Sequence, residues 1–191
     1  MTTYFYKFPV TPQVFYKTKY TYALVNLKPI VPGHVLVVPF RRVARLKQLN
    51  AKESTDFIAT VQLINEFIEK VYKADASNIA MQDGIAAGQS VPHVHCHIIP
   101  RYLKDGYGDH IYDLLEKHEA DLNGFFQQVC RGRIVAADMD RHPRSMEEME
   151  KEAKWLQGEL EKFVKAREGE KEEEEGKKEG EGKKEGEGKK E

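Results

Sequence analysis

Three histidines, His93, His95 and His97, alternate with apolar residues in the segment HVHCHII. In a β-strand, residues two apart point to the same face of the sheet. The spacing therefore predicts three imidazoles on one face, with the apolar residues between them pointing into a core. Neighbouring imidazoles are costly to protonate together, so packing alone explains this cluster poorly.

Two kinds of chemistry fit these residues. Neutral imidazoles at positions i and i+2 suit zinc or iron. One imidazole flanked by two others also suits nucleophilic catalysis, in which the neighbours orient the attacking ring and hold the substrate. A structural or surface cluster is the third reading, and the spacing alone leaves all three open.

A glycine-rich loop precedes the histidines and contains Asp83 and Gly84, then Gly88, Gln89 and Ser90. Its backbone N–H groups, amide and hydroxyl are donors of the kind that cradle phosphate oxygens. HVHCHII contains no Asp or Glu and therefore offers a single metal ion no carboxylate ligand. The loop therefore favours an anionic phosphate over a cation.

Strands and helices must position these side chains. Runs rich in β-branched and aromatic residues predict strands at 14–17, 22–26, 34–39, 78–83 and 93–99. Asn50 with Glu53, and Ser145 with Glu148, match capping boxes. They predict one helix that begins near residue 50 and a second over about 145–165, with a short helical piece around 111–118.

Charge divides the 191 residues into a body and a tail. Residues 167–191 comprise 8 basic, 11 acidic and 6 glycine residues, so this tail carries −3. The body, 1–166, has 22 basic and 20 acidic residues and carries +2. A tail without apolar side chains has nothing to offset its ordering entropy, which predicts disorder. The body fits one domain, with a long mobile loop over about 104–143.

Composition also excludes several classes of protein. The near-neutral body argues against general nucleic-acid binding. No apolar run approaches the roughly 18 residues of a membrane helix, and the N-terminal segment lacks secretory and transit patterns. Cys96 and Cys130 are too few for a disulfide scaffold and indicate reduced intracellular thiols. The expected location is the cytoplasm, with a nuclear share left open.

The blocks PGHVLVVP, which contains His34, MQDGIAAGQSVPHVHCHIIPR and SMEEMEKEA occur in this order along the chain. Together they resemble the histidine triad (HIT) superfamily and, within it, the fragile histidine triad (Fhit) branch of diadenosine triphosphate hydrolases. TYALVNLKPIVPGH is similar to fungal members. The resemblance implies an α+β fold with a five-stranded antiparallel sheet, two main helices and a homodimer.

The resemblance also implies a mechanism in two steps. The middle histidine, His95, is expected to attack the α-phosphorus of a dinucleoside polyphosphate, and water then hydrolyses the nucleotidyl-histidine. Diadenosine triphosphate would give AMP and ADP. His97 is expected to hydrogen-bond phosphate near the bridging oxygen, while His93 and His34 order the site.

The same resemblance assigns the substrate contacts. The residues expected to bind substrate are Phe8, Asn26, Gln82, Gly88, Gln89, Ser90 and His97. Tyr112 matches a tyrosine of the family's mobile loop and is a candidate regulatory site. No protein side chain is expected to ligate a metal; Mg²⁺ or Mn²⁺ would accompany the polyphosphate and reduce its charge.

Two other functions stay open. The phosphoramidase branch of the superfamily acts on AMP-linked amines, and a non-catalytic nucleotide-binding protein would signal through its substrate complex. His97 favours hydrolysis over nucleotidyl transfer, because the transferases carry Gln at the third triad position. Gln82, Gln89 and the long second helix favour the dinucleoside polyphosphate hydrolases.

Overall fold

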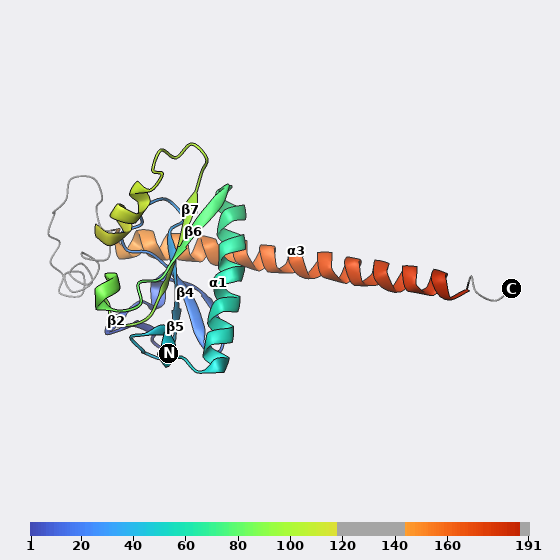
Figure 1. Cartoon of the computed structure of the whole chain (residues 1–191), viewed down its shortest axis with the longest axis horizontal. Helices are drawn as coiled ribbons and strands as arrows, with labels where there is room; N and C mark the ends of the chain where they lie inside the picture. The colour runs from blue at the N-terminus through green and yellow to red at the C-terminus, as the bar shows by residue number, and fades with distance from the viewer. Residues whose placement is uncertain (118–143, 188–191) are drawn as a thin grey trace. The chain divides into compact units, whose positions relative to one another are not determined.

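The computed structural model describes residues 1–117 and 144–187 (Figure 1). The chain divides into two units, Met1–Leu156 and Gln157–Glu191, and the site residues lie in the first. Most of the predicted mobile loop and Cys130 lie outside the described residues. Within the described residues, no helix is long and apolar enough to cross a bilayer.

Five antiparallel strands form the main sheet of the first unit, in the order β3-β4-β5-β7-β6. The strands are β3 (Val14–Lys17), β4 (Thr21–Val25), β5 (Val35–Pro39), β6 (Ala76–Ala80) and β7 (Cys96–Arg101). Every residue of β4 and β5 is buried, as expected for central strands rich in Val and Leu. Each predicted strand overlaps an observed one, and the predicted α+β fold with a five-stranded antiparallel sheet is confirmed.

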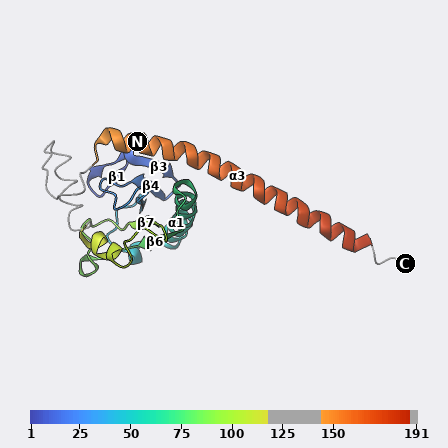
Figure 2. The ribbon, with the colours of Figure 1, turned by 90° about the horizontal axis from the view of Figure 1, so that it is seen from above.

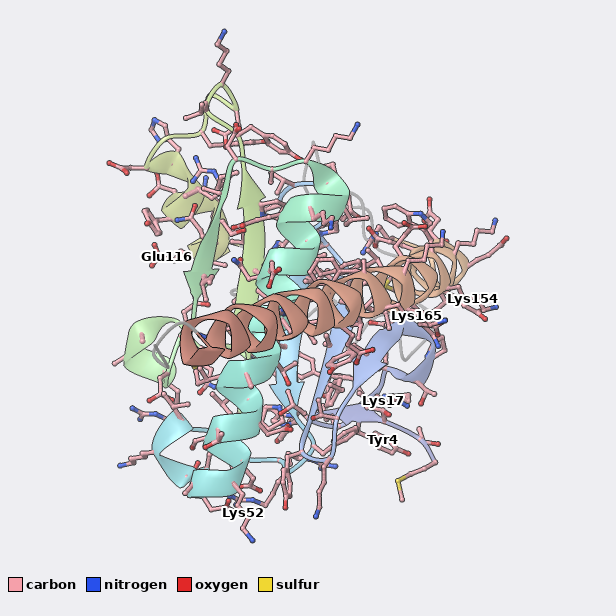
Figure 3. The ribbon with its side chains drawn as sticks, turned by 90° about the vertical axis from the view of Figure 1, so that its right-hand side faces the viewer. Tyr4, Lys17, Lys52, Glu116, Lys154 and Lys165 are labelled. Atoms are coloured by element: carbon pink, nitrogen blue, oxygen red, sulfur yellow. The ribbon has the colours of Figure 1, made fainter. Side chains whose placement is uncertain are left out.

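Helix α1 (Ala51–Tyr72) lies along the sheet and packs against β4, β5 and β7 (Figures 1 and 2). Its N-terminus has the predicted capping box. The Asn50 Oδ1 atom accepts the Glu53 N–H at 3.1 Å, and the Glu53 carboxylate accepts the Asn50 N–H at 2.9 Å. Phe57 and Ile64 are fully buried, whereas Lys52 in the first turn points away from the body (Figure 3).

Helix α3 (Met146–Glu187) also begins with the predicted capping box. Glu148 N–H donates to Ser145 Oγ at 3.2 Å, and Ser145 N–H donates to the Glu148 carboxylate at 2.7 Å. The helix is described to Glu187, beyond the predicted end near 165. Glu and Lys are good helix formers, which is compatible with helical backbone here, and the disorder of 167–191 stays a prediction.

A short helix over 110–117 matches the helical piece expected there. Its buried Ile111 and Leu115 cluster with Ile30, Val31 and Ile99. Ile30 and Val31 belong to the β4–β5 connection, and Ile99 lies on β7. This cluster therefore ties the connection to the strand that carries His97.

A small N-terminal hairpin was not predicted. It pairs β1 (Tyr4–Phe5) with β2 (Phe8–Pro9) and turns through Tyr6, which has a φ of 54°. Two-residue strands give no periodicity to read from a sequence.

The strand that carries the triad begins later than predicted. β7 starts after His95, so His93 and His95 lie in an irregular segment and only His97 lies in the strand. Val94 N–H, between the first two histidines, donates to the Val43 carbonyl at 2.7 Å, outside the ladder of β5. Strand alternation therefore does not by itself account for the gathering of the three histidines.

Candidate active site

His95 is buried, and its Nδ1 lies 2.8 Å from the main-chain carbonyl oxygen of His93. A carbonyl oxygen only accepts hydrogen bonds, so Nδ1 must carry the proton. In the neutral ring the lone pair then resides on Nε2. The structure thus holds His95 in the tautomer that a nucleophile needs.

His93 is fully buried, and both of its ring nitrogens are engaged by backbone groups. Nε2 lies 2.8 Å from the Pro39 carbonyl, and Nδ1 accepts the Tyr6 N–H at 2.9 Å. Burial lowers the pKa of His93 from 6.5 to about 4, with a smaller contribution from neighbouring His95. His93 is therefore a neutral supporting residue, whose own carbonyl oxygen orients His95.

His34 and His97 are joined by a hydrogen bond of 3.0 Å between Nε2 of His34 and Nδ1 of His97. The Ile30 N–H, which can only donate, lies 3.1 Å from Nδ1 of His34. His34 therefore carries its proton on Nε2 and donates it to His97. The Nδ1 atom of His97 accepts this hydrogen bond, so neutral His97 carries its own proton on Nε2.

Asn26 makes a further contact with His34. Its Nδ2 lies 3.2 Å from Nε2 of His34, while its Oδ1 accepts the Lys28 N–H at 3.1 Å. The second contact fixes the amide orientation, so the first brings two donors together. The His34 proton is therefore directed to the shorter contact with His97, at 3.0 Å.

Ring packing restricts the histidines further. The His95 and His97 centroids are 5.0 Å apart with the planes inclined at 62°, and Phe5 lies edge-on to His95 at 5.1 Å. Such edge-to-face contacts favour defined ring orientations. Cys96 points into the core, and burial raises the pKa of its thiol to about 12, which fits its predicted role as a small apolar residue.

The glycine-rich loop has two glycines in conformations that side chains rarely adopt. Gly84 has a φ of 110° and Gly88 a φ of 86°, and they flank a 3₁₀ turn, Ile85–Ala87. A Cβ at Gly84 would lie 2.7 Å from the Arg45 guanidinium. Glycine therefore lets the loop turn tightly beneath this arginine, which also pairs with Asp83 at 3.2 Å.

The predicted loop residues occupy different environments. Gln89 is buried, and its amide N–H donates to the Ala44 carbonyl at 2.8 Å, so this side chain anchors the loop. Gln82 lies close to Gly88, where a Cβ would be 3.3 Å from its Nε2. The Gln82 Oε1 is buried with no hydrogen-bond donor among the described residues. Ser90 is half-buried.

Two predicted residues lie outside the histidine network. Phe8 is buried on β2, with the Lys7 ammonium 5.7 Å from its ring. Tyr112 is 55% exposed on the short helix, and its hydroxyl accepts an amide N–H of Asn78 at 3.2 Å. Their predicted contacts with the base and with regulation stay predictions.

Several residues that support the site were missed from the sequence. Tyr6, Ile30 and Pro39 set histidine protonation through backbone groups, which carry no residue-type signal. Phe5 carries no motif or periodic signal in the sequence. The same holds for Arg144, whose guanidinium bonds to the carbonyl oxygen of Asn26.

The arrangement has the protonation pattern that a nucleophile and a donor require. The lone pair of neutral His95 is on Nε2 and the proton of neutral His97 is on Nε2, and contacts with His93 and His34 fix these two states. The ring nitrogens that fix these protonation states are hydrogen-bonded to backbone groups or to each other. Because these nitrogens are already engaged, the geometry favours nucleophilic catalysis over a metal site. Among the described residues, no group of three His, Cys, Asp or Glu side chains is placed to hold a metal ion.

The HIT domain family model matches residues 8–104 of this chain. A Schizosaccharomyces pombe protein named bis(5'-nucleosyl)-tetraphosphatase (asymmetrical) is 50% identical over 81% of this chain and 92% of its own length. A Saccharomyces cerevisiae bis(5'-adenosyl)-triphosphatase is 46% identical over 87% and 95%. The bifunctional bis(5'-adenosyl)-triphosphatase/adenylylsulfatase FHIT of Arabidopsis thaliana is 42% identical over 74% of each chain.

Solved structures agree with these similarities. The crystal structure of the Caenorhabditis elegans NitFhit protein aligns with a TM-score of 0.60 and 31% identity, over 83% of this chain and 30% of that one. Plasmodium falciparum diadenosine triphosphate hydrolase, in complex with cyclomarin A, aligns with a TM-score of 0.58 and 27% identity, over 80% and 78%. With the histidine network, the sheet and these matches in agreement, the chain belongs to the HIT domain family.

Proposed function

We propose that this chain hydrolyses dinucleoside polyphosphates and cleaves diadenosine triphosphate into AMP and ADP through a nucleotidyl-His95 intermediate. The observation that carries the proposal is the 2.8 Å hydrogen bond from His95 Nδ1–H to the His93 carbonyl, which places the lone pair on Nε2. The names of the S. cerevisiae and A. thaliana relatives support the substrate class.

In the first step, His95 Nε2 attacks the α-phosphorus and the bond from that phosphorus to the bridging oxygen breaks. AMP becomes bonded to His95, and ADP leaves with the electron pair of the broken bond. In the second step, water attacks the same phosphorus and loses a proton to solvent, and the phosphorus–nitrogen bond breaks with its electron pair returning to His95 Nε2. AMP leaves, and His95 returns to its starting state.

His97 assists the departure of ADP. Its Nε2–H donates a hydrogen bond to the bridging oxygen, where negative charge develops as the bond breaks. A diphosphate leaving group is weakly basic, so this hydrogen bond suffices without complete proton transfer. The His34 Nε2–H and the Ile30 N–H keep the His97 proton on the required nitrogen.

The relatives differ in the number of phosphates that their names give to the substrate. One relative is named for tetraphosphate cleavage and another for triphosphate cleavage, at 50% and 46% identity. Both substrates offer the same α-phosphorus and differ in the leaving group, ATP against ADP. We propose the triphosphate as the preferred substrate and propose that Mg²⁺ or Mn²⁺ arrives with it as a counter-ion.

We further propose that two copies form a homodimer through strand β6. In the described sheet β6 is an edge strand, and its Ile79 is 52% exposed. Edge strands present backbone groups that a second copy can pair with. Light scattering should give the mass of two chains, and Ile79→Lys should shift it towards one. A monomeric mass for the unmodified protein would contradict this assembly.

The experiment that tests the activity compares turnover of diadenosine triphosphate, diadenosine tetraphosphate and an AMP-linked amine by the purified protein. We expect AMP and ADP from the triphosphate at the highest kcat/KM. His95→Asn should lower kcat by at least about 1,000-fold while nucleotide binding persists.

Each other outcome has a definite meaning. Preference for the amine would identify a phosphoramidase, and preference for the tetraphosphate would correct the substrate length. Binding without turnover in the unmodified protein would support the non-catalytic role. Lys154→Gln is the matched control, because Lys154 is an exposed residue that pairs only with surface Glu150 at 2.7 Å among the contacts described (Figure 3).

A further inference from the structure

Arg144 directly precedes the N-terminal cap of α3 and holds one end of the β4–β5 connection, residues 26–34. Its Nε donates to the Asn26 carbonyl oxygen at 3.0 Å, and its Nη2 donates to the same oxygen. Its backbone N–H donates to the Leu27 carbonyl at 3.0 Å. One residue thus makes three hydrogen bonds to the first two residues of this connection.

Glu152 and Tyr72 complete a cluster around the guanidinium. Glu152 pairs with Nη1 of Arg144 and accepts the Tyr72 hydroxyl at 2.9 Å, and the Arg144 and Glu152 side chains are only 20% and 19% exposed. The Glu152 carboxylate therefore compensates the positive charge of the Arg144 guanidinium. Burial and the same carboxylate raise the pKa of Tyr72 well above its usual range, so its phenol remains a hydrogen-bond donor.

Tyr72 also contacts the far end of the same connection. A Cβ at Gly33, which has a φ of +83°, would lie 2.7 Å from the Tyr72 ring. The ring therefore lies directly against the backbone that precedes His34. The cluster contacts both ends of the connection, at Asn26 through Arg144 and at Gly33 through Tyr72.

The connection it holds contains the groups that orient His97. Ile30 N–H donates to His34, and His34 donates to His97, with distances of 3.1 and 3.0 Å. A shift of either end of the connection would move His34 relative to His97. Misplacement of about 1 Å can cost on the order of 100-fold in rate, even when it originates away from the reacting atoms.

We infer that Arg144, with Glu152 and Tyr72, is a positioning residue that fixes the β4–β5 connection so that His34 directs the His97 proton to the leaving group. The inference rests on the proposed hydrolysis, since it concerns the same reaction. Electrostatic attraction of the polyanionic substrate is the competing role for this cation. Its guanidinium is instead turned to the Asn26 carbonyl and the Glu152 carboxylate.

Two substitutions of Arg144 distinguish the positioning role from electrostatic attraction of the substrate. Arg144→Gln removes the charge and the paired N–H groups, whereas Arg144→Lys keeps the charge and loses the guanidinium geometry. Positioning predicts that both variants lower kcat on diadenosine triphosphate by about 10- to 100-fold, with KM within about 2-fold. Attraction of substrate predicts that Gln raises KM and that Lys restores it, a result that would overturn the inference.

A double-mutant cycle tests whether the effect passes through His34. In a His34→Ala background, Arg144→Gln should lower kcat by less than about 2-fold, because the residue it positions is gone. An equal loss in both backgrounds would overturn the inference. Nitrogen-15 NMR of the histidine rings provides a second readout, with loss of the single His34 tautomer expected in Arg144→Gln.

Controls keep the outcome interpretable. Lys154→Gln, on the exposed side of the same helix, should retain wild-type kcat. If Arg144→Gln does not fold, Tyr72→Phe removes only the hydroxyl and should still lower kcat; wild-type kcat in that variant would overturn the inference. An inactive wild-type protein would refute the proposed hydrolysis, whereas an active protein with unaffected Arg144 variants would refute the positioning role alone.

Discussion

Backbone groups determine the protonation of the buried histidines. The His93 carbonyl can only accept and the Ile30 N–H can only donate, so each fixes which nitrogen of its partner ring carries the proton. From these two constraints follow the lone pair on His95 Nε2 and the proton on His97 Nε2. Side-chain identity alone would allow either tautomer of each ring.

His97→Asn tests the donor at the residue scale. We expect kcat on diadenosine triphosphate to fall by about 100-fold, at the lower end of the range for acid catalysis because the leaving group is weakly basic. KM should change little, since the interaction strengthens as the bond breaks. Steady-state kinetics measure both quantities, and an unchanged kcat would exclude His97 from the leaving-group step.

His93 links stability to pH. Its pKa is about 4 in the folded chain against 6.5 as the ordinary value, because burial disfavours the charged ring. Between these pH values the unfolded chain binds a proton that the folded chain does not, so acidification favours unfolding by up to about 1.4 kcal/mol per pH unit. Urea denaturation from pH 7 to 4 should show this loss, and His93→Gln should have a shallower slope. An equal slope in both proteins would contradict the assignment.

At the scale of elements, the sequence predicts those helices and strands whose own residues carry a capping motif or a characteristic composition. Asn50 with Glu53 defined the start of α1, and runs rich in β-branched and aromatic residues located the strands. The start of β7 and the β1–β2 hairpin depend on partners far along the chain, which local pattern does not contain. The candidate histidines were all identified, whereas their tautomers depend on Tyr6, Ile30 and Pro39 backbone groups that any residue type supplies.

Gly33→Ala tests the packing of the β4–β5 connection. The new Cβ would lie 2.7 Å from the Tyr72 ring at a φ of +83°, so we expect a loss of about 1–3 kcal/mol in unfolding free energy together with a lower kcat. Gly106→Ala is the matched control, because Gly106 has a φ of +73° and open space around its Cβ position. Equal destabilisation of the two variants would show that strain, rather than the contact with Tyr72, is responsible.

At the scale of the whole molecule, the slightly basic body contains every proposed site residue, and the acidic tail contains none. A chain that ends at Lys165 should therefore keep wild-type kcat and KM. Far-ultraviolet circular dichroism of the two forms distinguishes a helix that continues to Glu187 from the predicted disorder, because only removal of a helix lowers the helical signal per molecule. A large loss of activity on truncation would show that the tail contributes to the site.

The central claim is that catalysis passes through a covalent bond between AMP and His95, and mass spectrometry tests it most directly. The reaction with diadenosine triphosphate is stopped in alkali during turnover and the protein is digested. Phosphoramidates of histidine survive alkali, so we predict an AMP adduct on the peptide that contains His95 and its absence in His95→Asn. Rapid turnover without any adduct, an adduct on another residue, or sustained turnover by His95→Asn would contradict the account.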